Sequence, residues 1–163
     1  MIRKAELKDL ERVLEIYAIA RKFMAATGNP NQWPDDSYPS RELLIEDIAL
    51  GRLYCLEEAK MIEGVFMFST EKDPTYSDIV DGEWPNDEPY GVIHRIASSG
   101  RVKGVLAKSV EFAKKSADNL RIDTHEENLV MQSALSKLGF EKCGIIFLEN
   151  GDPRIAFQLI VNK

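Results

Sequence analysis

The order in which the apolar spacing changes along the chain constrains its fold more than any other feature. Segments with apolar residues at three- and four-residue steps, typical of helices, alternate with short runs rich in β-favouring residues. The predicted order is β α α β β β α β α β β, with one strand–helix–strand connection near its middle. This order predicts an α/β fold in a single domain, 1–163, whose mixed central sheet of about seven strands has helices on both faces.

Capping and turn residues predict where the elements begin and end. Ser40 is expected to cap a helix that Gly51 ends, and Gly139 is expected to end a helix that begins near Asn128. The dipeptide at 150–151, Asn-Gly, is typical of a tight hairpin turn. Strands are predicted at 2–5, 53–56, 61–69, 91–97, 120–123, 143–149 and 154–161, and helices at 7–28, 40–51, 102–117 and 128–138.

Composition and charge exclude several classes of protein. The chain has 163 residues, 44% of them apolar, and a net charge of -6 with no block of lysine and arginine, so nucleic-acid binding is not expected. The longest stretch without a charge, 23–34, has 12 residues, which is too short to span a bilayer. The first residues lack the apolar run of a signal peptide, so a cytoplasmic protein is predicted. The two cysteines, Cys55 and Cys143, are too few for a disulfide framework or a zinc site, and no metal is expected.

The negative charge is concentrated in one stretch, 71–88, which we call the acidic segment. It contains seven acidic residues and one lysine, so its net charge is -6 and the rest of the chain has a net charge of zero. Its prolines and aromatic residues predict a structured loop.

The most specific local feature is a strand at 92–97 that runs through a small-residue loop into a helix. Such a junction presents backbone N–H groups and the positive end of a helix dipole, which suit a phosphate or pyrophosphate. The spacing of Gly100 and Gly104 matches neither a Walker A loop nor a dinucleotide fingerprint, so a plain strand-to-helix turn remains an alternative.

Two polar residues interrupt this strand. His94 and Arg95 are adjacent, so in a regular strand they are expected on opposite faces. His94 is either a hydrogen-bonded core histidine or a proton acceptor, and Arg95 is expected to pair with a carboxylate. A second histidine candidate, His125, lacks the partner four residues on that a metalloprotease helix needs, because that position is Leu129.

Together these residues resemble the GCN5-related N-acetyltransferase (GNAT) family along nearly the whole chain. The run from Arg101 to Leu106 looks like the family's cofactor signature, Arg or Gln followed by x-x-Gly-x-Gly or Ala. The segment 121–128, followed by Met131 and by 137–140, is similar to the family's second conserved region. The resemblance rests on these segments occurring in the order and spacing of the family, together with the matching order of helices and strands.

The resemblance implies a fold whose central strands splay apart around the cosubstrate acetyl-CoA. The backbone of Ile96 and Ala97 would pair with the pantetheine arm, and the Ile96 N–H would stabilise the developing oxyanion. Asn128 would reach the pantetheine from the other side of the splay. The pyrophosphate would be held by the N–H groups of Arg101, Val102, Lys103, Gly104, Val105 and Leu106.

The implied reaction is direct attack of a neutral amine on the thioester, without an acyl-enzyme. His94 is the expected base, because in a regular strand it shares a face with Ile96 and so points toward the same cleft. Glu83 is an alternative in the acidic segment, together with Asp87 and Glu88. The acidic segment either is a solvated loop or attracts a cationic acceptor. The acceptor pocket is expected to contain Trp33, Tyr38 and Trp84. A homodimer is a possible assembly.

Two positions depart from the family pattern. Leu106 occupies the place of a Gly or Ala, and Leu135 that of a tyrosine which often acts as the general acid. These departures keep a second hypothesis open, a noncatalytic acyl-CoA-binding or sensing module of the same fold. A phosphate-binding α/β module unrelated to acetyl-CoA is a third.

Overall fold

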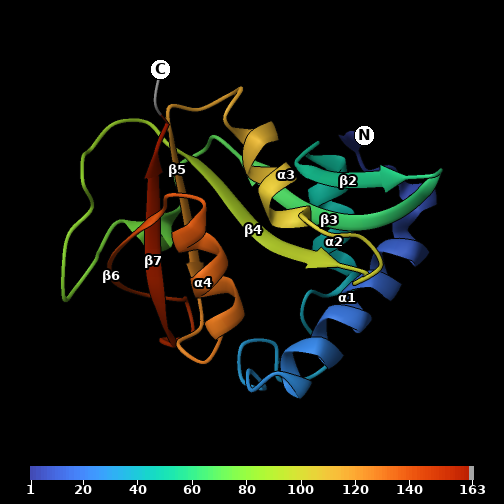
Figure 1. Cartoon of the computed structure of the whole chain (residues 1–163), viewed down its shortest axis with the longest axis horizontal. Coiled ribbons are helices and arrows are strands. Elements are labelled where there is room, and N and C mark those ends of the chain that lie inside the picture. Colours follow the sequence, from blue (N-terminus) through green and yellow to red (C-terminus); the bar gives the residue numbers. More distant parts are fainter. Residues whose placement is uncertain (162–163) are drawn as a thin grey trace.

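The computed structural model describes residues 1–161, which form a seven-stranded sheet and its covering helices (Figure 1). The strands are β1 (Ile2–Lys4), β2 (Leu53–Glu58), β3 (Met61–Ser69), β4 (Gly91–Ser98), β5 (Asn119–Thr124), β6 (Glu141–Phe147) and β7 (Pro153–Ile160). The α-helices are α1 (Leu10–Ala26), α2 (Arg41–Ala49), α3 (Val105–Ala113) and α4 (Leu129–Lys137), and two short 3-10 helices are η1 (Leu7–Asp9) and η2 (Pro74–Tyr76). The predicted α/β fold and element order are confirmed.

The expected caps explain most of the boundaries. The Ser40 hydroxyl oxygen accepts the Leu43 N–H at 3.1 Å at the start of α2, and the Asn128 side chain caps α4. The helix predicted at 102–117 is shorter at both ends, because it ends at Ala113 and the loop before it continues to Gly104. This residue caps α3 with φ = 78°, a left-handed conformation that glycine adopts without strain.

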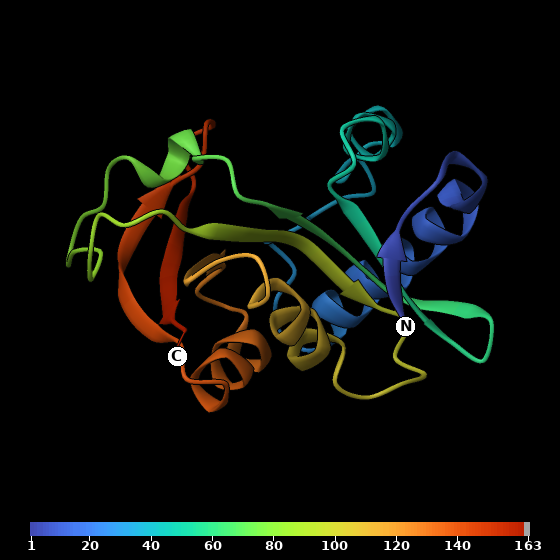
Figure 2. The same cartoon turned by 90° about the horizontal axis from the view of Figure 1, so that it is seen from above.

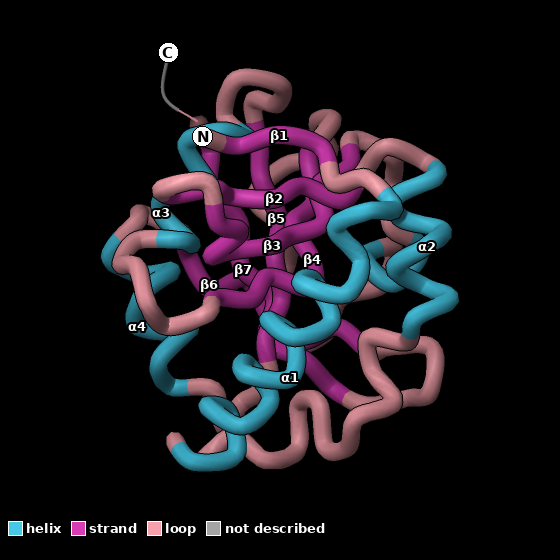
Figure 3. The backbone as a smooth tube through the Cα atoms, turned by 90° about the vertical axis from the view of Figure 1, so that its right-hand side faces the viewer, coloured by secondary structure: helices cyan, strands magenta, loops and turns pink. Residues whose placement is uncertain are grey.

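The sheet lies between two layers of helices (Figure 3). Helices α1 and α2 cover one face, where Val13 and Tyr17 of α1 pack against Val65 and Ala97. Helices α3 and α4 cover the other, where Val110 and Leu135 pack with Ile93 and Phe157 among others. None of the helices in residues 1–161 has both the length and the apolar character that crossing a bilayer requires.

The strands are ordered β1-β2-β3-β4-β5-β7-β6, and the β4–β5 pair is parallel. These two strands pair at only two positions, Gly91 with Leu120 and Val92 with Arg121. Beyond them β4 continues to Ser98 and β5 to Thr124 without pairing with each other, and Figure 1 shows the two diverging. The sheet therefore opens between β4 and β5 towards their carboxyl ends.

The acidic segment is largely irregular, as predicted, and its middle lies against the strands β6 and β7 (Figure 2). A bridge joins Val80 to Ile145 of β6. The guanidinium carbon of Arg121 lies 3.9 Å from the ring centre of Trp84 and 4.1 Å from that of Tyr90. These contacts fix the segment as part of the packed structure.

Candidate active site

A cavity of about 680 Å³ occupies the opening between β4 and β5. Ile93, His94 and Ile96 line it from β4, and Ile122 and Asp123 line it from β5. The loop after α1, the start of η2, helix α4 and the β6–β7 turn complete the wall. The divergence of two adjacent strands therefore makes room for a ligand in the middle of the sheet.

His94 is held between two carboxylates in this cavity. Its Nε2 lies 2.6 Å from Asp73 Oδ2, and its Nδ1 lies 3.8 Å from Asp123 Oδ2. The Asp123 carboxylate accepts a hydrogen bond of 2.7 Å from the buried Tyr76 hydroxyl. His94 is therefore anchored through one ring nitrogen and has the other free of a hydrogen bond to either carboxylate.

Asp73 is ionised in this arrangement. Burial alone would raise the pKa of Asp73, but hydrogen bonds from His94 and Thr75 lower it to about 2. An ionised carboxylate accepts hydrogen bonds only, so His94 Nε2 carries the hydrogen that it donates to Asp73. In the neutral ring, Nδ1 is then the atom that can accept a proton.

A bulge in β4 places His94 and Arg95 on the same face of the sheet. Val65 pairs with Ala97 and Met67 with His94, so Phe66 lies opposite both Arg95 and Ile96, and Arg95 has φ = 51°. The prediction that His94 and Arg95 lie on opposite faces, with Ile96 beside His94, is wrong. Ile96 packs instead on the face covered by α3 and α4.

Buried partners stabilise the bulge. The Tyr17 hydroxyl donates a hydrogen bond of 2.6 Å to the Arg95 carbonyl, and burial raises the pKa of Tyr17 well above its ordinary value, so this donor keeps its proton. The Arg95 guanidinium lies 2.8 Å from the fully buried Asp47, as expected of an arginine paired with a carboxylate. It also donates to the Tyr38 hydroxyl at 3.3 Å.

The loop between β4 and α3 presents backbone groups beside the opening. The Ser98 and Ser99 hydroxyl oxygens accept the N–H groups of Gly100 and Arg101, each at 3.1 Å. The first turn of any helix has N–H groups without partners in the helix, and in α3 these belong to residues that follow Gly104. Of the expected pyrophosphate residues, Arg101, Lys103 and Gly104 are exposed, Val102 and Leu106 are half-buried, and Val105 is buried. Arg101 Nε lies 3.4 Å from the carboxylate of the buried Glu63.

On the β5 side, Asn128 is buried and its side chain makes two hydrogen bonds. Its side-chain oxygen accepts the Met131 N–H at 3.0 Å, and its amide donates to the Gln32 side-chain oxygen at 3.0 Å. The same Gln32 oxygen accepts the Thr124 hydroxyl and the His125 N–H at 3.2 and 3.4 Å. Gln32 therefore ties the loop after α1 to the end of β5, across the open end of the splay.

The structure brings together only part of the predicted acceptor pocket. Trp33 and Tyr38 line the cavity, with ring centres 5.9 Å apart. Trp84 and Glu83 do not line it, which corrects both predictions. Trp84 is held against Arg121 and donates its indole N–H to the Tyr76 carbonyl at 2.9 Å, while Glu83 is exposed in the same stretch.

The cavity residues that were not predicted from the sequence include Asp73, Asp123 and Arg154. Asp73 belongs to the acidic segment, whose charge alone does not distinguish it from the other acidic residues there, and Asp123 is the last residue of the predicted strand 120–123, a position that could have been taken as a site. No group of three or more histidine, cysteine or acidic side chains in residues 1–161 could hold a metal ion.

Solved structures of acetyltransferases have the same fold. A GNAT-family acetyltransferase from Streptococcus agalactiae 2603 is 32% identical with a TM-score of 0.88, and the alignment covers 100% of this chain and 96% of that one. A GNAT-family acetyltransferase from Listeria monocytogenes 4b F2365 is 20% identical with a TM-score of 0.71, covering 98% and 93%. A ribosomal-protein-alanine N-acetyltransferase from Brucella melitensis is 18% identical with a TM-score of 0.61, covering 99% of both chains. The last two are similar in fold alone. No protein-family model matches the sequence, and neither does any curated protein.

Proposed function

Because the chain belongs to the GNAT family of acetyltransferases, we propose that it moves the acetyl group of acetyl-CoA to an amine by direct attack within a ternary complex. The observation that carries this proposal is the cavity at the β4–β5 splay, which contains a histidine with a free ring nitrogen beside an unpaired strand edge.

The residues around the splay fit acetyl-CoA. The β4 backbone beyond Val92 has no partner in β5, so Ile96 and Ala97 can pair with the pantetheine amides as a strand would. The first turn of α3 offers N–H groups and a helix dipole to the pyrophosphate, and the exposed Arg101 and Lys103 add positive charge. Bound there, acetyl-CoA supplies an activated acyl group on a thiol leaving group.

Acceptor activation is assigned to His94, with Asp73 as its positioning residue. An amine that arrives protonated loses two protons. His94 Nδ1 takes the first from the ammonium group, and the neutral amine then attacks so that the new N–C bond forms. The C–S bond breaks to release the thiolate of coenzyme A, which takes the second proton from the nitrogen. The Ile96 N–H is the donor proposed for the carbonyl oxygen as it gains negative charge, since it lies in the bulge, where the ladder is interrupted. Leu135 is fully buried in the core, so that position supplies no proton, and a thiolate with the pKa of a free thiol can leave unaided.

The charge of the cavity favours a cationic acceptor. Its lining includes two arginines, Arg95 and Arg154, and five carboxylates, Asp35, Asp73, Asp123, Glu149 and Asp152. An amine is mostly protonated at neutral pH, so carboxylates near the cavity raise its local concentration before His94 removes the proton.

The test is thiol release from acetyl-CoA with a panel of amines, peptides and amino acids. For an accepted amine, His94→Gln is expected to lower kcat by about 10²- to 10⁴-fold, the usual contribution of a general base. Glu83→Gln serves as the matched control, because Glu83 lies outside the cavity, and it is expected to retain wild-type turnover.

Unchanged turnover of His94→Gln across pH would remove His94 from this role. If calorimetry shows tight acetyl-CoA binding but no amine in the panel releases thiol, the noncatalytic acyl-CoA-binding function replaces the transferase. If acetyl-CoA does not bind at all, both are wrong.

A further inference from the structure

Arg154 is a buried arginine that lines the cavity without a carboxylate partner. It is only 6% exposed. Its guanidinium donates to two backbone carbonyls, that of Pro153 at 2.9 Å and that of Gln32 at 3.4 Å. Within residues 1–161, no aspartate or glutamate oxygen lies within 4.0 Å of it.

The two other arginines with little side-chain exposure are compensated. Arg95 is paired with the buried Asp47, and Arg121 is stacked between Trp84 and Tyr90. A buried cation without a counter-ion is costly, because two carbonyls replace only part of its hydration. A guanidinium has five N–H donors, so Arg154 retains capacity for an anion.

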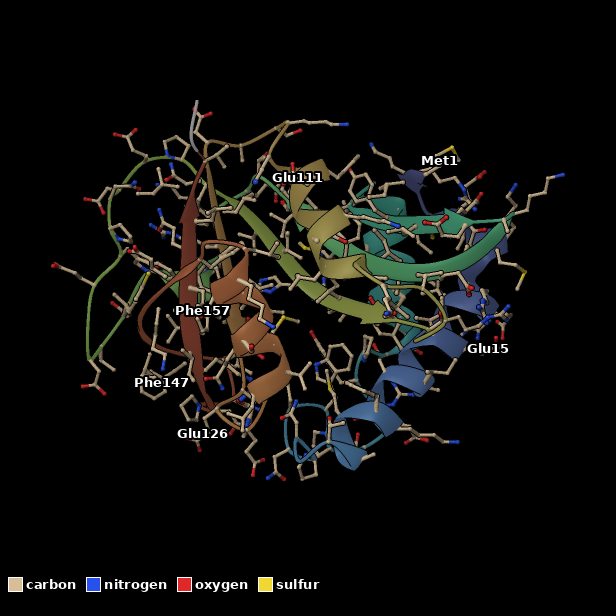
Figure 4. All side chains as sticks on the ribbon, viewed as in Figure 1. Met1, Glu15, Glu111, Glu126, Phe147 and Phe157 are labelled. Carbon is tan, nitrogen blue, oxygen red and sulfur yellow. The ribbon has the colours of Figure 1, made fainter. Side chains whose placement is uncertain are left out.

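The sheet register places Arg154 next to the proposed amine site. Asp123 pairs with Ala156 of β7, and Arg154 lies two residues before Ala156, so both side chains belong to the same face of the sheet. Diagonal neighbours of this kind are roughly 7–8 Å apart. Figure 4 shows Glu126, just after β5, and Phe147, which pairs with Pro153, at the same end of the molecule.

We propose that Arg154 binds a carboxylate of the acceptor, so that the substrate is a small molecule with both an amine and a carboxylate, such as an amino acid. This inference rests on the proposed acetyl transfer. The amine of such a zwitterion lies by His94 and the two aspartates around it, while its carboxylate takes the planar guanidinium in a bidentate contact. The acidic residues Glu149 and Asp152 are exposed at the mouth of the cavity, where solvent screens them.

The experiment compares amino acids with their α-amides, which keep the amine but lack the carboxylate. Wild-type protein is expected to acetylate the acids with a higher kcat/KM. Arg154→Gln is expected to lower kcat/KM for the acids by roughly 10- to 100-fold, the value of a charged hydrogen bond, and to change that for the amides little. Arg154→Lys keeps the positive charge but lacks the planar guanidinium that binds a carboxylate through two N–H groups, so an intermediate loss of kcat/KM for the acids is expected. The exposed Arg41→Gln is the control for removing one positive charge.

A second measurement separates this site from the transferase activity. Calorimetry with coenzyme A present compares N-acetyl-amino acids with N-acetyl-amino acid amides as ligands of the wild-type protein and of Arg154→Gln. If no amine is acetylated but the acids bind only to the wild type, the carboxylate site stands and the proposed function fails. If amines are acetylated and acids and amides react or bind equally, the carboxylate site is wrong. If Arg154→Gln lowers kcat/KM equally for acids and amides, the carboxylate site is also wrong, since a purely structural role of Arg154 would affect both kinds of substrate alike.

Discussion

At His94 the chemistry depends on two carboxylates that differ in their contacts. Asp73 accepts a hydrogen bond from one ring nitrogen, whereas the Asp123 carboxylate is 3.8 Å from the other and already accepts a hydrogen bond from Tyr76. Asp73 therefore selects the tautomer, and Asp123 is left to interact with the imidazolium that forms once His94 has accepted a proton.

Replacement of Asp73 by asparagine tests this pair through stability. The folded-state pKa of Asp73, about 2, lies below the ordinary value of 3.8, so its ionisation stabilises the fold above pH 4 and this contribution is lost as the pH falls through 2. Asp73→Asn is expected to reduce the free energy of unfolding by about 1 kcal/mol at pH 6, with allowance for solvent screening, and by less at pH 2. Urea denaturation at both pH values measures the difference.

The exposed Asp36→Asn controls for the loss of a negative charge in this experiment. If Asp73→Asn and the wild type lose the same stability between pH 6 and pH 2, the Asp73–His94 pair does not stabilise the fold.

Sequence patterns identify His94 as a polar residue inside an apolar strand, but they do not identify its surroundings. Asp73 is 21 positions away, and the two meet only because the start of the acidic segment turns back over β4. The face on which Arg95 lies depends on a bulge, and no residue type near position 95 signals one, since the positive φ falls on an arginine rather than a glycine. That irregularity is supported from outside the strand, by Tyr17 and Asp47.

At the level of elements, apolar spacing predicts which segments are helices and strands, but it does not describe how loops pack. The loop before α3 contains Val102 at a helical step from Val105, so spacing extends the predicted helix into the loop. Likewise, the charge of the acidic segment suggests a solvated loop, whereas Trp84 and Tyr76 anchor it to the sheet.

Gly82 tests whether the acidic segment is docked as described. It has φ = 153°, and a Cβ atom there would lie 1.9 Å from the Cys143 carbonyl oxygen of β6. Gly82→Ala is therefore expected to cost more than about 3 kcal/mol of unfolding free energy, unless the segment detaches, in which case protease cleavage within 77–90 becomes faster.

Gly151→Ala is the matched control, because Gly151 also has a positive φ, 90°, but its Cβ would meet nothing within 4 Å. It is expected to cost about 1 kcal/mol from backbone strain alone. Equal stability and equal cleavage of the two variants would show that the segment does not contact β6.

For the whole molecule, the splay divides the sheet into β1–β4 and β5–β7–β6, which share only two residue pairs. Family resemblance predicts this division, although residue spacing alone does not, because the strands on either side are both ordinary apolar strands. Across the open end, the contacts of Gln32 with Thr124 and Asn128 connect the halves. A ligand in the cavity would add a further connection between them.

Acetyl-CoA is therefore expected to stabilise the molecule and to protect a defined set of amides. At 100 times its Kd, binding contributes about 2.7 kcal/mol, which corresponds to a rise in Tm of roughly 5–10 °C for a chain of this length. Hydrogen exchange is expected to slow most at 93–98 of β4 and at 105–107 of α3, since these backbone groups lie at the strand edge and the helix start. ADP, which has a pyrophosphate but no pantetheine, is the control and is expected to leave 93–98 unprotected. Equal protection of β4 by both ligands, or no rise in Tm with acetyl-CoA, would mean that the splay is not the site of the pantetheine arm.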